Sequence, residues 1–184
     1  MRTFISVELP EAVRKKVAEL INGLKDTGAA VKWVEAGNLH ITLKFLGWVE
    51  DRDLDNLTAL TAQAVSGKGS FRARFKGVGT FPDGRDPRVV WVGTAEGGDG
   101  LCELAKSLEE TLSKAGFRRE EREFRPHITA GRVKEKKGVD RLKAKIQSQV
   151  NAEFGETLVD RVHIMKSTLT PKGPVYEKVK EVML

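Results

Sequence analysis

Cysteine is nearly absent from this chain of 184 residues, because Cys102 is the only one. A single thiol excludes an internal disulfide and any zinc site built from several cysteines. No apolar run approaches the roughly 20 residues that a membrane-spanning helix needs. The sequence opens directly on an alternating, strand-like pattern, so we expect no signal peptide, no membrane association and a cytoplasmic location.

The composition fits neither a disordered nor a fibrous protein. Hydrophobic residues make up 40% of the chain and charged residues 32%, which is the balance of a globular protein. The length corresponds to one domain, or to two small lobes that share a core. The 32 Lys and Arg exceed the 26 Asp and Glu and leave a net charge of +6, which favours an anionic partner.

The positive charge is concentrated in residues 118–145, which contain eleven Lys and Arg against five Asp and Glu. Such clustering is typical of a surface that binds nucleic acid, and it is also found on a solvated surface without a partner. We keep both interpretations for this basic stretch.

The spacing of apolar residues in the first half of the chain changes between the two-residue period of a strand and the helical period. Gly77 and Gly79 interrupt the last strand pattern, and a turn rich in Pro, Gly and Asp follows at residues 82–87. Strands are predicted over residues 2–9, 31–34, 39–46 and 71–81, and helices over residues 11–25 and 51–65.

The second half repeats this order of elements. Strands are predicted over residues 88–93, 124–133, 152–158, 161–166 and 175–182, and helices over residues 99–115 and 139–150. The repetition predicts an α+β protein that forms a single bilobal domain over residues 1–184. Its first half covers about residues 1–81 and its second about 88–184, and strands can be exchanged between the lobes. Each lobe is a mostly antiparallel sheet with helices outside, and the free faces of the two sheets bound a central cleft.

Histidine is also scarce, and two of the three histidines lie in the same tripeptide, His40-Ile41-Thr42 and His127-Ile128-Thr129. Residues i and i+2 of a strand project from the same face about 7 Å apart. Each motif therefore presents an imidazole and a hydroxyl together, while its isoleucine points into the core. The third histidine, His163, has Met165 at the corresponding position and is interpreted as structural.

A pair of imidazoles can perform acid–base catalysis at neutral pH, one activating a nucleophile while the other protonates a leaving oxygen. The hydroxyls of Thr42 and Thr129 can donate hydrogen bonds to phosphate oxygens and hold a phosphorus atom between the imidazoles. This set predicts phosphodiester chemistry without a cofactor. His40 and His127 have no third ligand at metal-binding spacing, so no metal site is predicted.

Several segments outside these tripeptides match a known family in the same order along the chain. Both His-x-Thr motifs of that family are intact. The one local departure is Ala130-Gly131 before Arg132, where a bulkier residue is common in the family. The matching segments are Met1-Arg2-Thr3-Phe4-Ile5, Glu8-Leu9-Pro10, Val31-Lys32-Trp33-Val34, Leu39 to Gly47, Arg125 to Thr129 with Arg132, Ser167-Thr168-Leu169 and Gly173-Pro174-Val175-Tyr176.

Over nearly its whole length the sequence resembles the RNA 2′,3′-cyclic phosphodiesterases, also named 2′-5′ RNA ligases, of the two-histidine (2H) phosphoesterase superfamily. The resemblance implies two lobes related by a pseudo-twofold axis, with the catalytic cleft between them. It implies hydrolysis of a terminal 2′,3′-cyclic phosphate to a 2′-phosphomonoester, with 2′-5′ joining as the reverse activity. His40 resembles the proton donor of the family and His127 the proton acceptor.

Three basic residues are further candidates for contacts with substrate. Lys44 continues the alternation of His40 and Thr42, so a regular strand would turn it toward the cleft. Arg125 alternates with His127 in the same way. Arg132 matches the arginine of the family but shares the face of His127 only if a bulge occurs at Gly131. Among the aromatic residues, Phe45 and Trp33 are expected in the core, with base stacking as the alternative for Trp33.

The sequence leaves three alternatives to hydrolysis of RNA ends. The same site can join RNA through 2′-5′ linkages, or it can open a small cyclic nucleotide instead of RNA. The third is a non-catalytic RNA-binding module that uses the basic stretch, although binding alone gives no reason for paired His-x-Thr motifs. The expected partner is RNA that ends in a 2′,3′-cyclic phosphate, such as tRNA fragments, and the expected state is a monomer.

Overall fold

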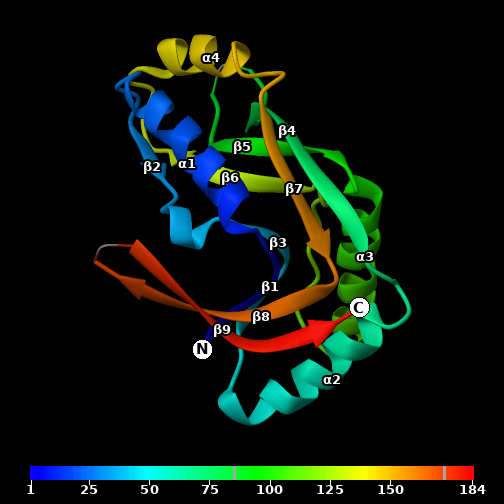
Figure 1. Ribbon diagram of the computed structural model, residues 1–184. Helices are drawn as coiled ribbons and strands as arrows, with labels where there is room; N and C mark the ends of the chain where they lie inside the picture. The colour runs from blue at the N-terminus through cyan, green and yellow to red at the C-terminus, as the bar shows by residue number, and fades with distance from the viewer. Residues whose placement is uncertain (85, 172) are drawn as a thin grey trace.

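Two antiparallel sheets flanked by helices make up the fold, as Figure 1 shows for the computed structural model. Residues 1–84, 86–171 and 173–184 are described. Arg85, within the predicted turn at residues 82–87, lies outside them. We call the sheets A and B. Sheet A has the strand order β3 (His40–Trp48), β1 (Arg2–Glu8), β8 (Arg161–Thr170) and β9 (Gly173–Met183), and sheet B has the order β2 (Val31–Trp33), β6 (His127–Val133), β5 (Val89–Glu96), β4 (Phe71–Phe81) and β7 (Glu153–Val159).

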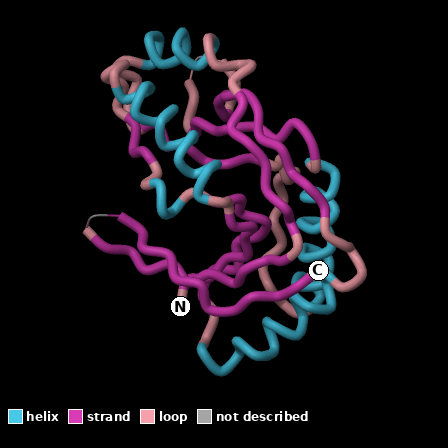
Figure 2. Tube along the Cα trace, viewed as in Figure 1, coloured by secondary structure: helices cyan, strands magenta, loops and turns pink. Residues whose placement is uncertain are grey.

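Helices cover the outer side of each sheet (Figure 2). Helices α2 (Leu54–Val65) and α3 (Gly98–Lys114) pack together, α3 against β3 and α2 against β9. Helix α1 (Glu11–Lys25) packs against β7 and α4 (Val139–Gln147). Two short 3-10 helices, η1 (Ala36–Asn38) and η2 (Asp51–Asp53), flank β3. The predicted α+β class, with two antiparallel sheets and outer helices, is confirmed.

Each sheet takes strands from both halves of the chain. Sheet A combines β1 and β3 with β8 and β9, whereas sheet B combines β2 and β4 with β5, β6 and β7. Helix α1 follows a strand of sheet A yet packs on sheet B, as its position beside β7 in Figure 1 shows. The buried side chains accordingly form one cluster that extends through both sheets. Neither sheet can bury its apolar face without residues from the other half.

The helices follow from the spacing of their apolar residues. In α1 the residues Val13, Val17, Ile21 and Leu24 are buried, which is one stripe at helical spacing. Gly28 has a φ of 68° just after the helix, a conformation that glycine adopts readily. No helix among the described residues combines the length and the apolar character needed to cross a membrane.

The structure contradicts the prediction that Lys44 faces the cleft. Thr42 pairs with Ser6 but Lys44 pairs with Ile5, so β3 contains one extra residue at this point. Such a bulge reverses the faces of all later side chains. Lys44 is consequently 4% exposed on the core side. Its Nζ donates hydrogen bonds to Glu109 Oε2 at 2.6 Å and to the carbonyl of Arg118 at 3.1 Å.

The same bulge makes the prediction of a buried Phe45 wrong. Phe45 pairs with Phe4 across the sheet and is 61% exposed, on the face that carries His40. Trp33 agrees with the prediction, because it is partly buried and packs against the core.

Lys44 therefore has a structural role that a stability measurement can check. Lys44→Ala should lower the free energy of unfolding by roughly 3 kcal/mol, because it leaves the Glu109 carboxylate without its buried partner. Lys44→Met combined with Glu109→Gln should recover most of this loss. Urea denaturation measures both. A single variant within about 0.5 kcal/mol of wild type would contradict the assignment.

Candidate active site

A backbone carbonyl fixes the orientation of the His40 ring at the start of β3. The Nδ1–H of His40 donates to the carbonyl oxygen of Asn38 at 2.7 Å. The neutral ring then carries its lone pair on Nε2, which lies 2.8 Å from the hydroxyl oxygen of Thr42. Asn38 is itself held, since its Nδ2 donates to the carbonyl of Pro174 at 2.8 Å.

His127 is held in the same manner at the start of β6. Its Nδ1–H donates to the carbonyl oxygen of Arg125 at 2.6 Å. The neighbouring carbonyl, that of Pro126, accepts a hydrogen bond from the hydroxyl of Thr94 at 3.3 Å. In both motifs, therefore, the carbonyl two residues before the histidine selects the tautomer, and the lone pair of the neutral ring is left on Nε2.

Each imidazole also lies edge-to-face against an aromatic ring from a distant strand. The rings of His40 and Tyr176 are 5.2 Å apart at 89°, and those of His127 and Phe81 are 5.2 Å apart at 87°. Phe4 packs against His40 as well, with a centroid distance of 4.9 Å. These contacts restrict rotation of the two imidazoles, so that hydrogen bond and packing together define where Nε2 lies.

The two histidines lie near enough to influence each other electrostatically. Strands β3 and β6 lie in contact, although they belong to different sheets. Burial lowers the pKa of His40, the hydrogen bond to Asn38 partly offsets this, and the charge of His127 lowers it further. We call the face of sheet A with His40 and the face of sheet B with His127 the site faces; they bound the central cleft between the sheets.

The charge on Arg132 reaches both sides of the cleft. Burial lowers the pKa of His127, the bond to Arg125 raises it, and the charge of Arg132 lowers it. Burial raises the pKa of Tyr176, and the charges of Arg132 and Arg2 lower it. The free protein therefore holds both imidazoles mainly neutral at pH 7. The nearby positive charges of Arg132 and Arg2 favour the binding of an anion.

A second bulge explains how Arg132 reaches the site. Thr129 pairs with Trp91 but Gly131 pairs with Val90, so β6 contains an extra residue at Ala130. The bulge returns Arg132 to the face of Thr129. The structure thus places Arg132 near His127. Lys44, in contrast, is buried on the core side of its sheet.

Arg125 lies at the border of the site. Its guanidinium is 3.8 Å from Glu123, with 67% of the side chain exposed, and 5.9 Å from the centroid of Phe81. Since Phe81 also contacts His127, Arg125 lies near this histidine with most of its side chain exposed.

Sequence reasoning missed the aromatic rings that position the imidazoles. Tyr176, the only tyrosine of the chain, is 136 residues away from His40, and Phe81 is separated from His127 by 46 residues. The alternation of β1 places Phe4 on the same face as Ser6 and Glu8. This was the one local pattern in the sequence that could have indicated an aromatic ring beside His40. Contacts between distant strands leave no periodic pattern in the sequence.

His163 lies in β8 beside a pocket of about 180 Å³ that His40 also lines. It is 3% exposed, and its Nε2 is 3.2 Å from Glu181 and 3.8 Å from Glu8. This burial between carboxylates agrees with the interpretation of a structural histidine. Within the described ranges no group of three His, Cys, Asp or Glu side chains could hold a metal ion.

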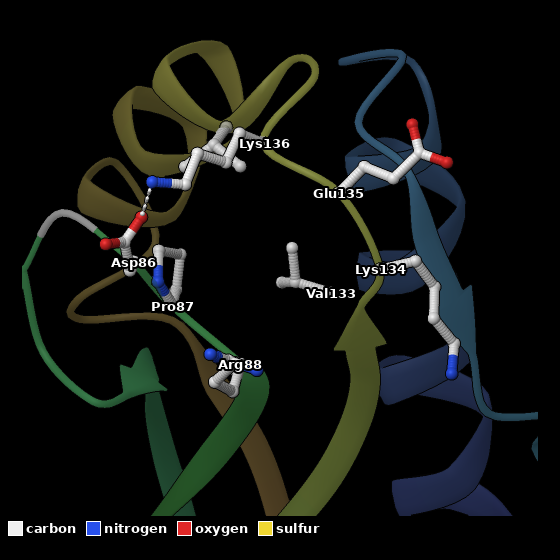
Figure 3. A pocket seen from close by; sticks show the side chains of 8 residues that line it. Asp86, Pro87, Arg88, Val133, Lys134, Glu135 and Lys136 are labelled. Carbon is white, nitrogen blue, oxygen red and sulfur yellow. Dashed lines mark ion pairs between the residues drawn. The ribbon is translucent and has the colours of Figure 1, made fainter.

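The basic stretch of residues 118–145 does not form one surface along the cleft. Figure 3 shows part of it around a second pocket, of about 290 Å³, where Lys136 pairs with Asp86 at 2.8 Å. Val133, which borders this pocket, follows Arg132 in a strand whose side chains alternate between faces. The pocket therefore lies beyond the end of β6, on the side covered by α4 rather than on the site face.

Comparison with known proteins gives consistent matches over the chain. The model of the 2′-5′ RNA ligase superfamily matches residues 9–170. A Methanocaldococcus jannaschii protein named RNA 2′,3′-cyclic phosphodiesterase is 38% identical over 98% of this chain and 99% of its own length. A Thermotoga maritima protein of the same name is 39% identical over 98% of this chain and 94% of its own.

Solved structures agree with these sequence matches. The structure of TT0787 from Thermus thermophilus has a TM-score of 0.81 at 30% identity and covers 100% of this chain and 98% of that one. E. coli LigT complexed with 3′-AMP has a TM-score of 0.79 at 25% identity, with 100% and 97% coverage. The resemblance noted from the His-x-Thr motifs is confirmed, and the chain belongs to the 2′-5′ RNA ligase superfamily.

Proposed function

We propose that this protein hydrolyses RNA 2′,3′-cyclic phosphate ends to 2′-phosphomonoesters by acid–base catalysis between His40 and His127. The observation that carries the proposal is the matched pair of imidazoles, each held at Nδ1 by a backbone carbonyl with Nε2 left to react. Relatives named RNA 2′,3′-cyclic phosphodiesterase and the binding of 3′-AMP by LigT support it.

In the proposed reaction the two imidazoles act on opposite sides of phosphorus. Nε2 of neutral His127 takes a proton from water, and the water oxygen attacks phosphorus. The bond from phosphorus to the 3′ oxygen breaks, and protonated His40 gives its proton to that oxygen. The 2′ oxygen keeps the phosphate, and exchange of protons with solvent restores both histidines.

The threonines stabilise the charge that develops on phosphorus. In the free protein the Thr42 hydroxyl lies against Nε2 of His40, so a bound phosphate would replace the imidazole as its acceptor. Thr129 occupies the equivalent position two residues after His127, and Arg132 adds positive charge on the same face. Donors fixed in place before reaction stabilise a transition state more than mobile water does.

Two alternatives use the same site. Joining of RNA through a 2′-5′ linkage opens the same cyclic phosphate with a 5′-hydroxyl of RNA in place of water, so it uses the same proton transfers and is the reverse of cleavage of that linkage. A cyclic phosphodiesterase of small nucleotides would need no contact beyond the reacting phosphate and its nucleoside. A non-catalytic RNA-binding module would show no turnover of any cyclic phosphate.

Removal of either imidazole should reduce turnover strongly. His40→Ala and His127→Ala should each lower kcat by roughly 10²- to 10⁴-fold, the contribution of one acid or base. The double variant should lose much less than the product of the two factors, because both groups act in one transition state.

His163→Gln is the matched control, because the amide can still bond Glu181. It should keep activity within a few-fold of wild type. Steady-state kinetics with a cyclic phosphate, together with a thermal melt of each variant, gives the comparison. Equal damage from all three substitutions would remove the case for a two-histidine site.

The pH dependence of kcat/KM should be bell-shaped, with its optimum below 6.5. The pKa values of both histidines are lowered from that ordinary value. Activity rises as His127 becomes neutral and falls as His40 loses its proton, so both limbs lie at acidic pH. The optimum of kcat should be higher, because bound phosphate raises both pKa values.

Arg132→Ala supplies a control for this profile. Loss of the cation should raise the pKa of His127 and move the acidic limb upward, toward the alkaline limb. Initial rates across pH 4 to 9 at constant ionic strength measure both profiles. A single sigmoidal rise in kcat/KM would contradict the proposed proton transfers.

A further inference from the structure

Two aromatic side chains on β3 are exposed without an evident structural reason. Phe45 is 61% exposed and Trp48 is 75% exposed. The other large hydrophobic residues exposed in the described part of the chain are aliphatic or methionine. An exposed aromatic pair on one strand is an uncommon surface for a protein that does not bind something there.

Both rings lie on the site face of sheet A. Phe45 pairs with Phe4, whose ring contacts His40 at 4.9 Å, and the rings of Phe4 and Phe45 are 6.2 Å apart. A further bulge follows, after which Trp48 pairs with Arg2. Since Arg2 and Phe4 are two residues apart in β1, their side chains point to the same side of the sheet.

Arg2 links this surface to the site electrostatically. It is exposed, and its charge acts on Tyr176, the ring that stands edge-on against His40. Trp48, Arg2 and Phe45 therefore form a strip, which we call the β3 strip, and the ring of Phe4 lies between this strip and His40. At about 3.3 Å per paired residue, Phe45 is about 13 Å and Trp48 about 20 Å along the strand from His40.

The chemistry of the β3 strip matches single-stranded nucleic acid. Exposed aromatic rings stack on bases of any sequence, and an adjacent cation attracts the phosphate between them. The distance to Trp48 exceeds the length of one nucleoside, so the mononucleotide that carries the reacting phosphate cannot reach it. Only a longer chain can occupy both the histidine site and Trp48.

We propose that Phe45, Trp48 and Arg2 form a subsite for the single-stranded RNA nucleotides that precede the reacting 3′ end. The inference rests on the proposed function, since it takes the cyclic phosphate end to lie at His40 and His127. Phe45 and Trp48 stack on successive bases, and Arg2 binds a phosphate of the backbone. The subsite gives the enzyme its preference for RNA over a small cyclic nucleotide.

The test compares two substrates in each variant: a mononucleotide 2′,3′-cyclic phosphate and a single-stranded RNA pentamer with the same end. Phe45→Ala and Trp48→Ala should each raise KM for the pentamer by roughly 5- to 150-fold. Both should leave kcat/KM for the mononucleotide unchanged. Trp48→Phe should retain most of the affinity and Trp48→Leu should not, because leucine is apolar but has no π face.

Arg2→Ala should weaken the binding of the pentamer by removing one positive charge. The slope of log affinity against log salt should fall by about 0.7, the value for one phosphate of a single strand. Leu158→Ala is the apolar control, since Leu158 is 52% exposed on β7. Lys136→Ala is the cationic control, and it lies at the pocket of Figure 3. Both controls should behave as wild type.

A binding measurement separates failure of the subsite from failure of the proposed function. Fluorescence anisotropy of a labelled pentamer with a 2′-phosphate end reports affinity without turnover. If the wild type turns over neither substrate, the proposed function fails, and the anisotropy of Trp48→Ala still decides the subsite. Unchanged pentamer affinity in Phe45→Ala and Trp48→Ala, or an equal loss with both substrates, overturns the inference.

Discussion

A hydrogen bond from a histidine Nδ1–H to the carbonyl two residues earlier is the interaction on which the site depends. It occurs at 2.7 Å in one motif and 2.6 Å in the other. Because the backbone is the acceptor, the tautomer and direction of each ring are set by the chain segment that leads into the strand, Asn38 before β3 and Arg125 before β6. The backbone acceptor holds the proton on Nδ1 and leaves the lone pair of each neutral ring on Nε2.

The exchange of strands between the halves positions the two motifs relative to each other. Each histidine begins a strand that pairs with a strand from its own half of the chain, β3 with β1 and β6 with β5. The aromatic ring against each histidine comes from further across the sheet, Tyr176 from β9 and Phe81 from β4. Those two strands belong to the opposite halves of the sequence. The geometry of one imidazole thus requires that both halves of the chain be folded.

The sequence predicted the face on which a side chain lies where the strand alternation was regular, and it gave the wrong face where a bulge interrupted that alternation. Alternation over two residues correctly placed Ile41 and Ile128 in the core beside each histidine. The same rule failed for Lys44 and Phe45, because the extra residue in β3 depends on pairing with β1, which no local pattern reveals. The bulge that Arg132 required does occur, although the extra residue is Ala130 rather than Gly131. The partners of the imidazoles, Tyr176 and Phe81, could not be predicted, since they are brought there by long-range pairing.

The most direct test of the two-histidine mechanism is the position of phosphate in the product. An RNA oligomer with a 2′,3′-cyclic phosphate end would be incubated with the protein in excess chelator and followed by ³¹P NMR. Attack assisted by His127 with proton donation from His40 predicts conversion of the cyclic signal to a 2′-phosphomonoester alone, at the same rate with and without chelator. A 3′-phosphomonoester, or activity that chelator abolishes and a divalent ion restores, would contradict the assignment of the two histidines.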